Sequence, residues 1–351
     1  MSELKNVTDY LRVAVERGGS DLHLSSGAPP AARVDGHLLP LEEFCLDDAA
    51  TKQLVFDTLT ESQRAQLEKD WELDYAIHVE GVGRFRGNLH FVRGHVEAAF
   101  RHIPEEIPDL ATLGHYPVIE QICQLRRGLI LLTGVTGSGK TTTLASMVKR
   151  ISETRSGVIV TIEDPIEFVY PHLSCLVKQR EIGHDTKSFP KALRQALRQD
   201  PDVIVVSELR DLDTIRIALT AAETGHLVIA TLHTVDAPQS VDRLVDVFPS
   251  DQQQQIVAQL ANVLEAIVSQ RLIRKVDGQG RALATEVMRM NHGLRTCIRE
   301  RKVEQIVGLI EIGQGEGMHT IDESLEQLLH SGQISLEEAQ FNCRDHRRFK
   351  S

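Results

Sequence analysis

A glycine-rich octapeptide near the middle of the chain has the composition of a phosphate-binding loop. Residues 134–141, GVTGSGKT, match the pattern G-x-x-x-x-G-K-[ST], between the strand-like run LILLT and the helix-like run KTTTLASM. Glycines let the backbone turn its N–H groups towards a phosphate, a lysine adds charge to the β and γ oxygens, and a threonine hydroxyl can bind Mg²⁺. The predicted phosphate-binding residues are Gly134, Val135, Thr136, Gly137, Ser138, Gly139, Lys140, Thr141 and Thr142, with Thr141 also a predicted Mg²⁺ ligand.

Three apolar segments beyond the loop each end in a side chain that phosphate chemistry can use. VIVTI is followed by Glu163, VIVV by Ser207 and Glu208, and LVIAT leads to His233. Because ligands of open α/β sheets bind at the carboxyl ends of the strands, we expect these acids and this histidine to converge on Lys140. One acid has to hold Mg²⁺ or its water and one has to orient the attacking water, and the residues leave that division open.

A strand-like segment near residue 90 carries polar side chains at every second position, and two of them are arginines. In RFRGNLHF, residues 84–91, one face is apolar and the other is polar, with Arg84, Arg86, Asn88 and His90. The polar face is either a solvated sheet surface or a source of arginine fingers that reach a γ-phosphate across a subunit boundary.

Apolar periodicity indicates a small N-terminal domain in this 351-residue chain. The first 19 residues read as an amphipathic helix, and alternating segments follow around a turn at Asp35–Gly36. A helical stretch from about Asp47 to Glu68 precedes further strand-like segments. We therefore expect an α+β domain over residues 1–103.

The remainder of the chain changes pattern twice. Residues 104–117 have no clear period and contain three prolines, which predicts a linker. Residues 118–277 hold short, continuously apolar runs between helical segments, which predicts a doubly wound α/β domain with a parallel sheet. Residues 278–351 have mostly helical periodicity and predict a C-terminal helical subdomain.

Composition and charge exclude several classes of protein. With 41 % hydrophobic and 25 % charged residues the chain is typical of a soluble globular protein. No apolar run approaches the roughly 20 residues of a transmembrane helix and no secretory signal opens the chain, so we expect a cytoplasmic protein without membrane insertion. A net charge of −11 disfavours nonspecific nucleic-acid binding, which depends on phosphate neutralisation. The five cysteines form no C-x-x-C pair, which argues against zinc and disulfides.

Five longer stretches resemble the PilT-like type IV pilus retraction motors of the secretion ATPase superfamily. SDLHLSSGAPPAARVDG is similar to the opening of that family's PAS-like N-terminal domain, and GVTGSGKTTTL to its Walker A loop. TIEDPIEF resembles the acidic box, ALRQALRQDPDVIVVSELRD the Walker B region, and TAAETGHLVIATLHTVDAPQSVDRLVDVFP the histidine box. The resemblance covers almost the whole chain and implies a RecA-like P-loop domain behind a PAS-like domain.

The resemblance also implies roles for single residues. Glu163 takes the position of the catalytic acid that acts on the attacking water, and Glu208 that of the Walker B carboxylate that acts on the metal. His226 and His233 fall in the histidine box, which senses or positions the phosphates. Arginine fingers in trans become the favoured interpretation of the arginine-bearing strands, with Arg84, Arg86 and Arg101 as candidates.

Two stretches depart from the retraction motors that the chain resembles. GLRTCIRE, residues 293–300, matches only in part the C-terminal motif Ala-Ile-Arg-Asn-Leu-Ile-Arg-Glu of the retraction branch. Ser207 stands where the family usually has glycine before the Walker B glutamate, and we expect slower hydrolysis from it. The four-cysteine zinc insertion and the extra N-terminal domains of pilus assembly and type II secretion ATPases are absent, which favours the retraction branch.

The resemblance implies a homohexameric ring that uses ATP and Mg²⁺ to retract type IV pili. Its nucleotide sites would lie between the two domains, with the linker as hinge, and each would be completed by a neighbouring subunit. The implied partners are an inner-membrane platform protein at the base of the pilus and a paralogous retraction motor. Two alternatives stay open: an accessory ring subunit that binds ATP and hydrolyses it weakly, and a P-loop motor that translocates nucleic acid.

Overall fold

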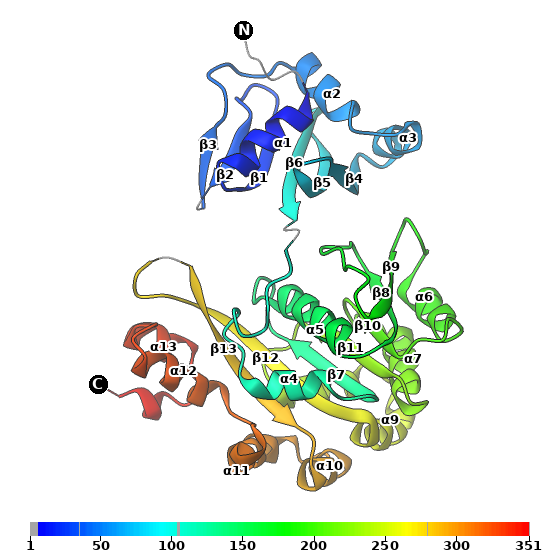
Figure 1. Ribbon diagram of the computed structural model, residues 1–351, viewed down its shortest axis with the longest axis vertical. Helices are drawn as coiled ribbons and strands as arrows, with labels where there is room; N and C mark the ends of the chain where they lie inside the picture. Colours follow the sequence, from blue (N-terminus) through cyan, green and yellow to red (C-terminus); the bar gives the residue numbers. More distant parts are fainter. Residues whose placement is uncertain (1–5, 35, 104–105, 279, 351) are drawn as a thin grey trace. The chain divides into compact units, whose positions relative to one another are not determined.

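The computed structural model describes residues 6–34, 36–103, 106–278 and 280–350 (Figure 1). The chain divides into two compact units: unit 1 is Met1–Glu106 with Glu167–Val169, and unit 2 is Ile107–Ile166 with Tyr170–Ser351. Three parts of the sequence-based predictions lie outside the described residues. They are the start of the first helix at residues 1–5, Asp35 of the predicted turn, and Pro104 and Glu105 of the predicted linker.

Unit 1 is an antiparallel sheet with helices, as the predicted α+β class requires. Within the described residues the sheet has six strands in the order β3-β2-β1-β6-β5-β4. The strands are β1 (Gly19–Leu24), β2 (Ala31–Val34), β3 (His37–Pro40), β4 (Glu72–Val79), β5 (Gly83–Val92) and β6 (His95–Ile103), and the helices are α1 (Val7–Glu16), α2 (Asp48–Phe56) and α3 (Glu61–Asp70).

The helical stretch predicted from Asp47 to Glu68 is two helices. Asp47 caps the start of α2 by accepting a hydrogen bond from the Ala50 N–H. Thr60 then starts α3 with a capping box, in which its side chain and that of Gln63 each bond the other residue's backbone. A capping box satisfies N–H groups that only a helix start leaves open, so the chain breaks the stretch at Thr60.

The alternation predicted for residues 84–91 is confirmed in β5. Phe85 and Leu89 are 1 % and 0 % exposed and belong to the core of unit 1. Arg84 and Arg86, on the opposite face, are half-buried. The core-facing residues hold the strand in register, and the arginines are therefore fixed on the other face.

Unit 2 is a doubly wound α/β domain. Its sheet, over the part of the chain that the structure describes, has seven strands in the order β13-β12-β7-β11-β10-β8-β9. The strands are β7 (Gly128–Thr133), β8 (Gly157–Glu163), β9 (Cys175–Glu181), β10 (Val203–Val206), β11 (Leu227–Leu232), β12 (Leu264–Arg274) and β13 (Arg281–Arg289). The strands β7, β11, β10, β8 and β9 run parallel.

Helices cover the parallel strands, so β7, β10 and β11 are buried along their whole length. The helix α4 (Pro117–Cys123) precedes β7, and the helices between the strands are α5 (Lys140–Thr154), α6 (Phe189–Ala196), α7 (Leu212–Glu223), α8 (Ala237–Asp246) and α9 (Ser250–Val263). This burial explains the continuously apolar strand sequences. The predicted fold class, an α/β RecA-like P-loop domain with a parallel sheet preceded by a small α+β domain, is confirmed.

The segment predicted as mostly helical, residues 278–351, begins with a strand. β13 pairs antiparallel with β12 along its whole length and so belongs to the sheet of unit 2. The helices follow it: α10 (His292–Arg299), α11 (Ile306–Ile312), α12 (Ile321–His330) and α13 (Leu336–Asn342). RALATEVMR was overlooked because its small and β-branched residues have no helical period, whereas the segments after it do. In Figure 1, α12 and α13 lie beside the β12–β13 hairpin.

The described part of the predicted linker packs on unit 2. Ile107 and Leu110 are buried. Lys149 of α5 donates hydrogen bonds to the Ile107 carbonyl and to the Asp109 carboxylate, at 3.0 and 2.8 Å. These apolar side chains and hydrogen bonds attach the segment to α5 from Ile107 onwards, although its prolines give it no secondary-structure period.

None of the helices described in the structure is long and apolar enough to cross a membrane.

His115, in the same segment, is half-buried beside α5. Its Nε2 lies 2.8 Å from the Thr143 hydroxyl, which also accepts a hydrogen bond from the Gln270 side-chain amide at 2.8 Å. Because Thr143 accepts from Gln270, its own proton is available for His115 Nε2, which requires a neutral imidazole. Burial, with a smaller contribution from the charge of His319, lowers the pKa of His115 from 6.5 to about 4.

The free energy of unfolding should therefore fall as the pH drops from about 6.5 to about 4, because in this range His115 binds a proton in the unfolded chain but not in the folded chain. At pH 5 this side chain alone removes about 2 kcal/mol relative to pH 7. The midpoint of urea denaturation at the two pH values measures this, with His115→Gln as the comparison. The variant should lose less stability on acidification than the wild type; an equal loss would refute the assignment.

Candidate functional site

The predicted phosphate-binding loop connects β7 to α5, as expected. Gly134, Gly137 and Gly139 all have positive φ, of 145°, 79° and 88°. A Cβ at Gly134 would lie 2.5 Å from both the Gln270 carbonyl oxygen and the Ser138 hydroxyl. Only glycine fits a backbone with this angle and this close approach. The loop therefore leads directly into the N-terminus of α5, where helical N–H groups favour an anion.

Lys140 lies inside this loop. The residue is 7 % exposed, and its Nζ donates hydrogen bonds to the carbonyls of Gly134 and Val135 at 2.7 and 3.0 Å. Arg281 of β13 also donates a hydrogen bond to the loop, to the Gly137 carbonyl at 3.4 Å. The loop is thus held around a lysine charge, which is the arrangement that polyphosphate oxygens require.

The parallel register brings the carboxyl ends of four strands to one edge of the sheet. Thr133 pairs with Leu232, so β7 and β11 end at the same level. Val206 of β10 pairs with Ala230 of β11 and with Ile162 of β8. Glu163, at the end of β8, and Glu208 and His233, which follow β10 and β11, therefore lie at the same edge of the sheet as the loop.

Glu163 is the last residue of β8 and is 5 % exposed. Its Oε1 accepts hydrogen bonds from the Thr161 hydroxyl at 2.6 Å and from the Gln179 side-chain amide at 3.0 Å. Both donors fix the direction of the carboxylate. A buried carboxylate held by two neutral donors can orient a water molecule and accept its proton.

Glu208 contacts an arginine and a histidine. Its Oε1 lies 3.2 Å from His233 Nε2, and its Oε2 lies 2.8 Å from Arg210 Nη2. Arg210 also approaches Asp164 at 4.0 Å. The contact between Glu208 and His233 joins the ends of β10 and β11, so these two predicted residues act at one place.

Ser207 is fixed between the neighbouring strands through its backbone. Its N–H donates to the Ile162 carbonyl at 2.9 Å, and its carbonyl accepts from the Thr231 hydroxyl. The side chain is half-buried. A residue at position 207 therefore has little freedom to move away from Glu208.

The structure does not bring His226 to this edge. His226 precedes β11, and its backbone carbonyl accepts from the Gly128 N–H at the start of β7. Its Nδ1 lies 3.0 Å from the Ala221 carbonyl and 3.2 Å from the Thr224 hydroxyl. One strand thus separates His226 from His233, and the role of both histidines in sensing or positioning the phosphates stays a prediction. The histidine box spans the whole strand, so its two ends face opposite edges of the sheet.

The three candidate arginine fingers share one face of the unit 1 sheet. Arg86 and Arg101 are directly opposite each other on β5 and β6, and Arg84 is two residues from Arg86. Arg101 Nε contacts Asp21 at 2.9 Å, whereas Arg86 Nε lies 3.7 Å from Asp74. Of these two ion pairs, the shorter one orients Arg101.

Sequence reasoning missed Thr161, Gln179 and Arg210. Thr161 and Arg210 are each two residues from a predicted acid, and a period of two along an extended chain could have identified them. Gln179 comes from β9, and only the pairing of β8 with β9 reveals it.

The residues present fit a nucleotide with Mg²⁺. Across the described residues, no group of three or more His, Cys, Asp or Glu side chains is placed to hold a metal ion. Mg²⁺ commonly takes one or two protein oxygens and completes its shell with water and substrate phosphates. Thr141 and Glu208 beside a phosphate loop meet that requirement.

Comparisons with known proteins agree over nearly the whole chain. A family model described as Type II/IV secretion system protein matches residues 10–340. The type IV pilus retraction ATPase PilT of Pseudomonas aeruginosa is 45 % identical over 95 % of this chain and 97 % of its own. The type IV pilus ATPase PilU of the same organism is 38 % identical over 94 % of this chain and 86 % of its own. A crystal structure of the pilus retraction motor PilT with bound ADP has a TM-score of 0.92 at 45 % identity and covers 98 % of both chains.

Thr161→Val should lower kcat for ATP hydrolysis about tenfold with little change in KM, because it leaves Glu163 buried but poorly oriented. Steady-state kinetics measure this split. Thr285→Val is the matched control, since Thr285 is also a buried threonine of this sheet and contacts His319 instead. Equal effects of the two substitutions would mean that Thr161 acts only on stability.

Proposed function

This chain belongs to the Type II/IV secretion system protein family, and we propose that it is an ATP-driven motor that retracts type IV pili. The observation that carries the proposal is 45 % identity to a protein named for pilus retraction over 95 % of the chain. That span includes both units, so it extends beyond the phosphate loop that many unrelated NTPases have in common.

The residues at the edge of the unit 2 sheet have separate roles in this proposal. The backbone of Gly134–Thr141 and the Lys140 ammonium bind the phosphates of ATP, and the Thr141 hydroxyl and Glu208 hold Mg²⁺. The metal, when bound, neutralises charge on the β and γ oxygens. Glu163 orients the attacking water and accepts its proton, while Thr161 and Gln179 hold its carboxylate. His233 keeps Glu208 in place through their contact.

The arginines of unit 1 are the proposed trans elements. Arg84, Arg86 and Arg101 lie on one sheet face, and an arginine supplied to a γ-phosphate stabilises charge in the transition state. A closed ring, which we propose to be a homohexamer, would let each subunit supply this face to a neighbour. Arg101 is the best oriented candidate because of its ion pair with Asp21.

The setting follows from the same proposal. A cytoplasmic ring of this kind would work at the inner-membrane base of the pilus, against a platform protein, and remove pilin subunits from the filament. A paralogous motor would take part alongside it, because PilT and PilU occur together in one organism and this chain is similar to both.

An accessory ring subunit with weak hydrolysis is the second candidate. Ser207 favours it, because a side chain beside Glu208 can crowd the metal position. The similarity to PilU does not separate the candidates, since that protein is also named an ATPase. The rate of hydrolysis itself decides between the two functions.

We expect the steady-state ATPase rate per subunit to rise with protein concentration as the ring forms, which gel filtration follows in parallel. Glu163→Gln keeps the shape of the side chain but removes the base, and should lower kcat by at least about a hundredfold. Assembly with ATP but negligible turnover in the wild type would favour the accessory subunit. Turnover that requires added DNA would instead favour a nucleic-acid motor.

Ser207→Gly should raise kcat about threefold, a change of about 0.7 kcal/mol in the barrier, because it removes the side chain next to Glu208. The comparison is Ser207→Ala, which removes the hydroxyl but keeps the Cβ. Unchanged turnover in Ser207→Gly would show that the serine does not limit hydrolysis.

A further inference from the structure

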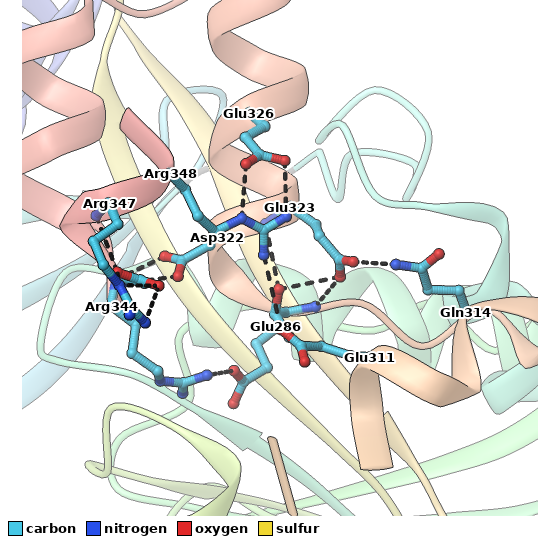
Figure 2. A network of polar contacts seen from close by, with 11 residues as sticks. Glu286, Glu311, Gln314, Asp322, Glu323, Glu326, Arg344, Arg347 and Arg348 are labelled. Atoms are coloured by element: carbon cyan, nitrogen blue, oxygen red, sulfur yellow. Dashed lines mark hydrogen bonds and ion pairs between the residues drawn. The ribbon is translucent and has the colours of Figure 1, made fainter. Parts of the chain in front are cut away.

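The C-terminal segment after α13 is fastened to unit 2 through its backbone. Asp322, 4 % exposed in the first turn of α12, accepts the N–H groups of Arg344 and Asp345 at 2.6 and 2.9 Å. Phe349 is buried, and its carbonyl accepts from Gln340 at 2.7 Å. These contacts fix the backbone at Arg344 and so restrict the direction of its side chain (Figure 2).

Arg344 points at a buried carboxylate of the sheet. Its Nη1 lies 2.8 Å from Glu286 Oε2, and Figure 2 shows the two side chains meeting below the C-terminal segment. Glu286 lies on β13 and is 1 % exposed. Arg344 Nη2 also lies 3.4 Å from Asp236. A carboxylate so deeply buried requires a partner charge, and Arg344 supplies that charge.

The same two carboxylates hold the N-terminus of α8. Asp236 Oδ1 accepts the Gln239 N–H at 2.9 Å, and Glu286 Oε1 accepts the Ala237 N–H at 3.0 Å. Both are N–H groups that the first turn of a helix leaves open. The Arg344 guanidinium therefore offsets the negative charge of both Asp236 and Glu286, the two carboxylates that cap the start of α8.

The start of α8 is joined to the nucleotide edge by a short, hydrogen-bonded turn. Ser240 donates to the Asp236 carbonyl, and the hydroxyls of Ser240 and Thr234 lie 2.6 Å apart. Thr234 directly follows His233, which contacts Glu208 at 3.2 Å. Only Thr234 and Val235 separate His233 from Asp236, so a shift of the start of α8 is passed to His233.

We propose that Arg344 is a positioning residue for the contact between His233 and Glu208, acting through Asp236 and Glu286. The C-terminal segment thereby becomes part of the machinery for hydrolysis, although it lies outside the P-loop, Walker B and histidine-box motifs. The inference rests on the proposed ATPase function.

The test is a double-mutant cycle in the full-length chain. Arg344→Ala should lower kcat for ATP about tenfold, the scale of a small misplacement at an active site, with KM changed less than about twofold. Arg344→Lys keeps the charge and should restore part of the rate. In a His233→Ala background, Arg344→Ala should have no further effect on kcat, because the contact between His233 and Glu208 through which Arg344 acts is already removed.

Arg348→Ala is the matched control. Arg348 lies in the same segment but pairs with Glu326 of α12 and approaches Glu311 of α11. The substitution therefore removes contacts of the C-terminal segment and leaves the carboxylates at the start of α8 unchanged. Its kcat should stay within about twofold of the wild type. An equal loss of kcat in Arg344→Ala and Arg348→Ala, or multiplicative losses in the double variant, would overturn the inference.

A second variant keeps the test decisive if Arg344→Ala does not fold. Asp236→Asn removes a partner charge of Arg344, while asparagine still caps α8. It should reproduce the loss of kcat at an unchanged melting temperature, and an unchanged kcat would overturn the inference. A wild-type chain without ATPase activity would instead refute the proposed function, and the two failures are therefore distinguishable.

Discussion

The register of the parallel strands in unit 2 is the constraint on which the site depends. Side chains along a strand alternate between the two faces, so a slip of one residue between β8 and β10 would turn Glu163 away from the loop. Both faces of these strands are packed in the core, so such a slip would exchange the side chains of the two faces and disrupt their close packing. Packing of apolar side chains that take no part in catalysis thus determines which polar side chains lie together at the edge of the sheet.

Contiguous motifs were the part of the site that the sequence could predict. The loop from Gly134 to Thr141 contains its own turn, charge and helix start, and the strand ends at Glu163, Glu208 and His233 follow from one topological rule. His226 and His233 belong to one sequence pattern, the histidine box, but the strand β11 between them places them at opposite edges of the sheet. A motif identifies residues, and the strand length decides where they lie.

The residues that support the site were harder to predict, because they come from elsewhere in the chain. Gln179 reaches Glu163 from the neighbouring strand, and Arg344 reaches Glu286 from beyond the last helix. Such pairs have no fixed spacing, since each depends on a register or a packing that the local pattern does not contain. The strand β13 and the break between α2 and α3 were missed for a related reason, because the hydrophobic periodicity of both segments is weak. Pairing with β12 makes β13 a strand, and the capping box at Thr60 starts α3.

The packed segment that starts at Ile107 also has a mechanical meaning. Tension applied to the chain at Ile107 is shared by two anchor points on α5, one at Lys149 and the other at Thr143. The segment from Ile107 to His115 is therefore a short connection attached at both ends to α5 and does not act as a flexible linker. Since α5 begins at Lys140, a pull on this segment loads the helix whose first turn we propose to bind phosphate.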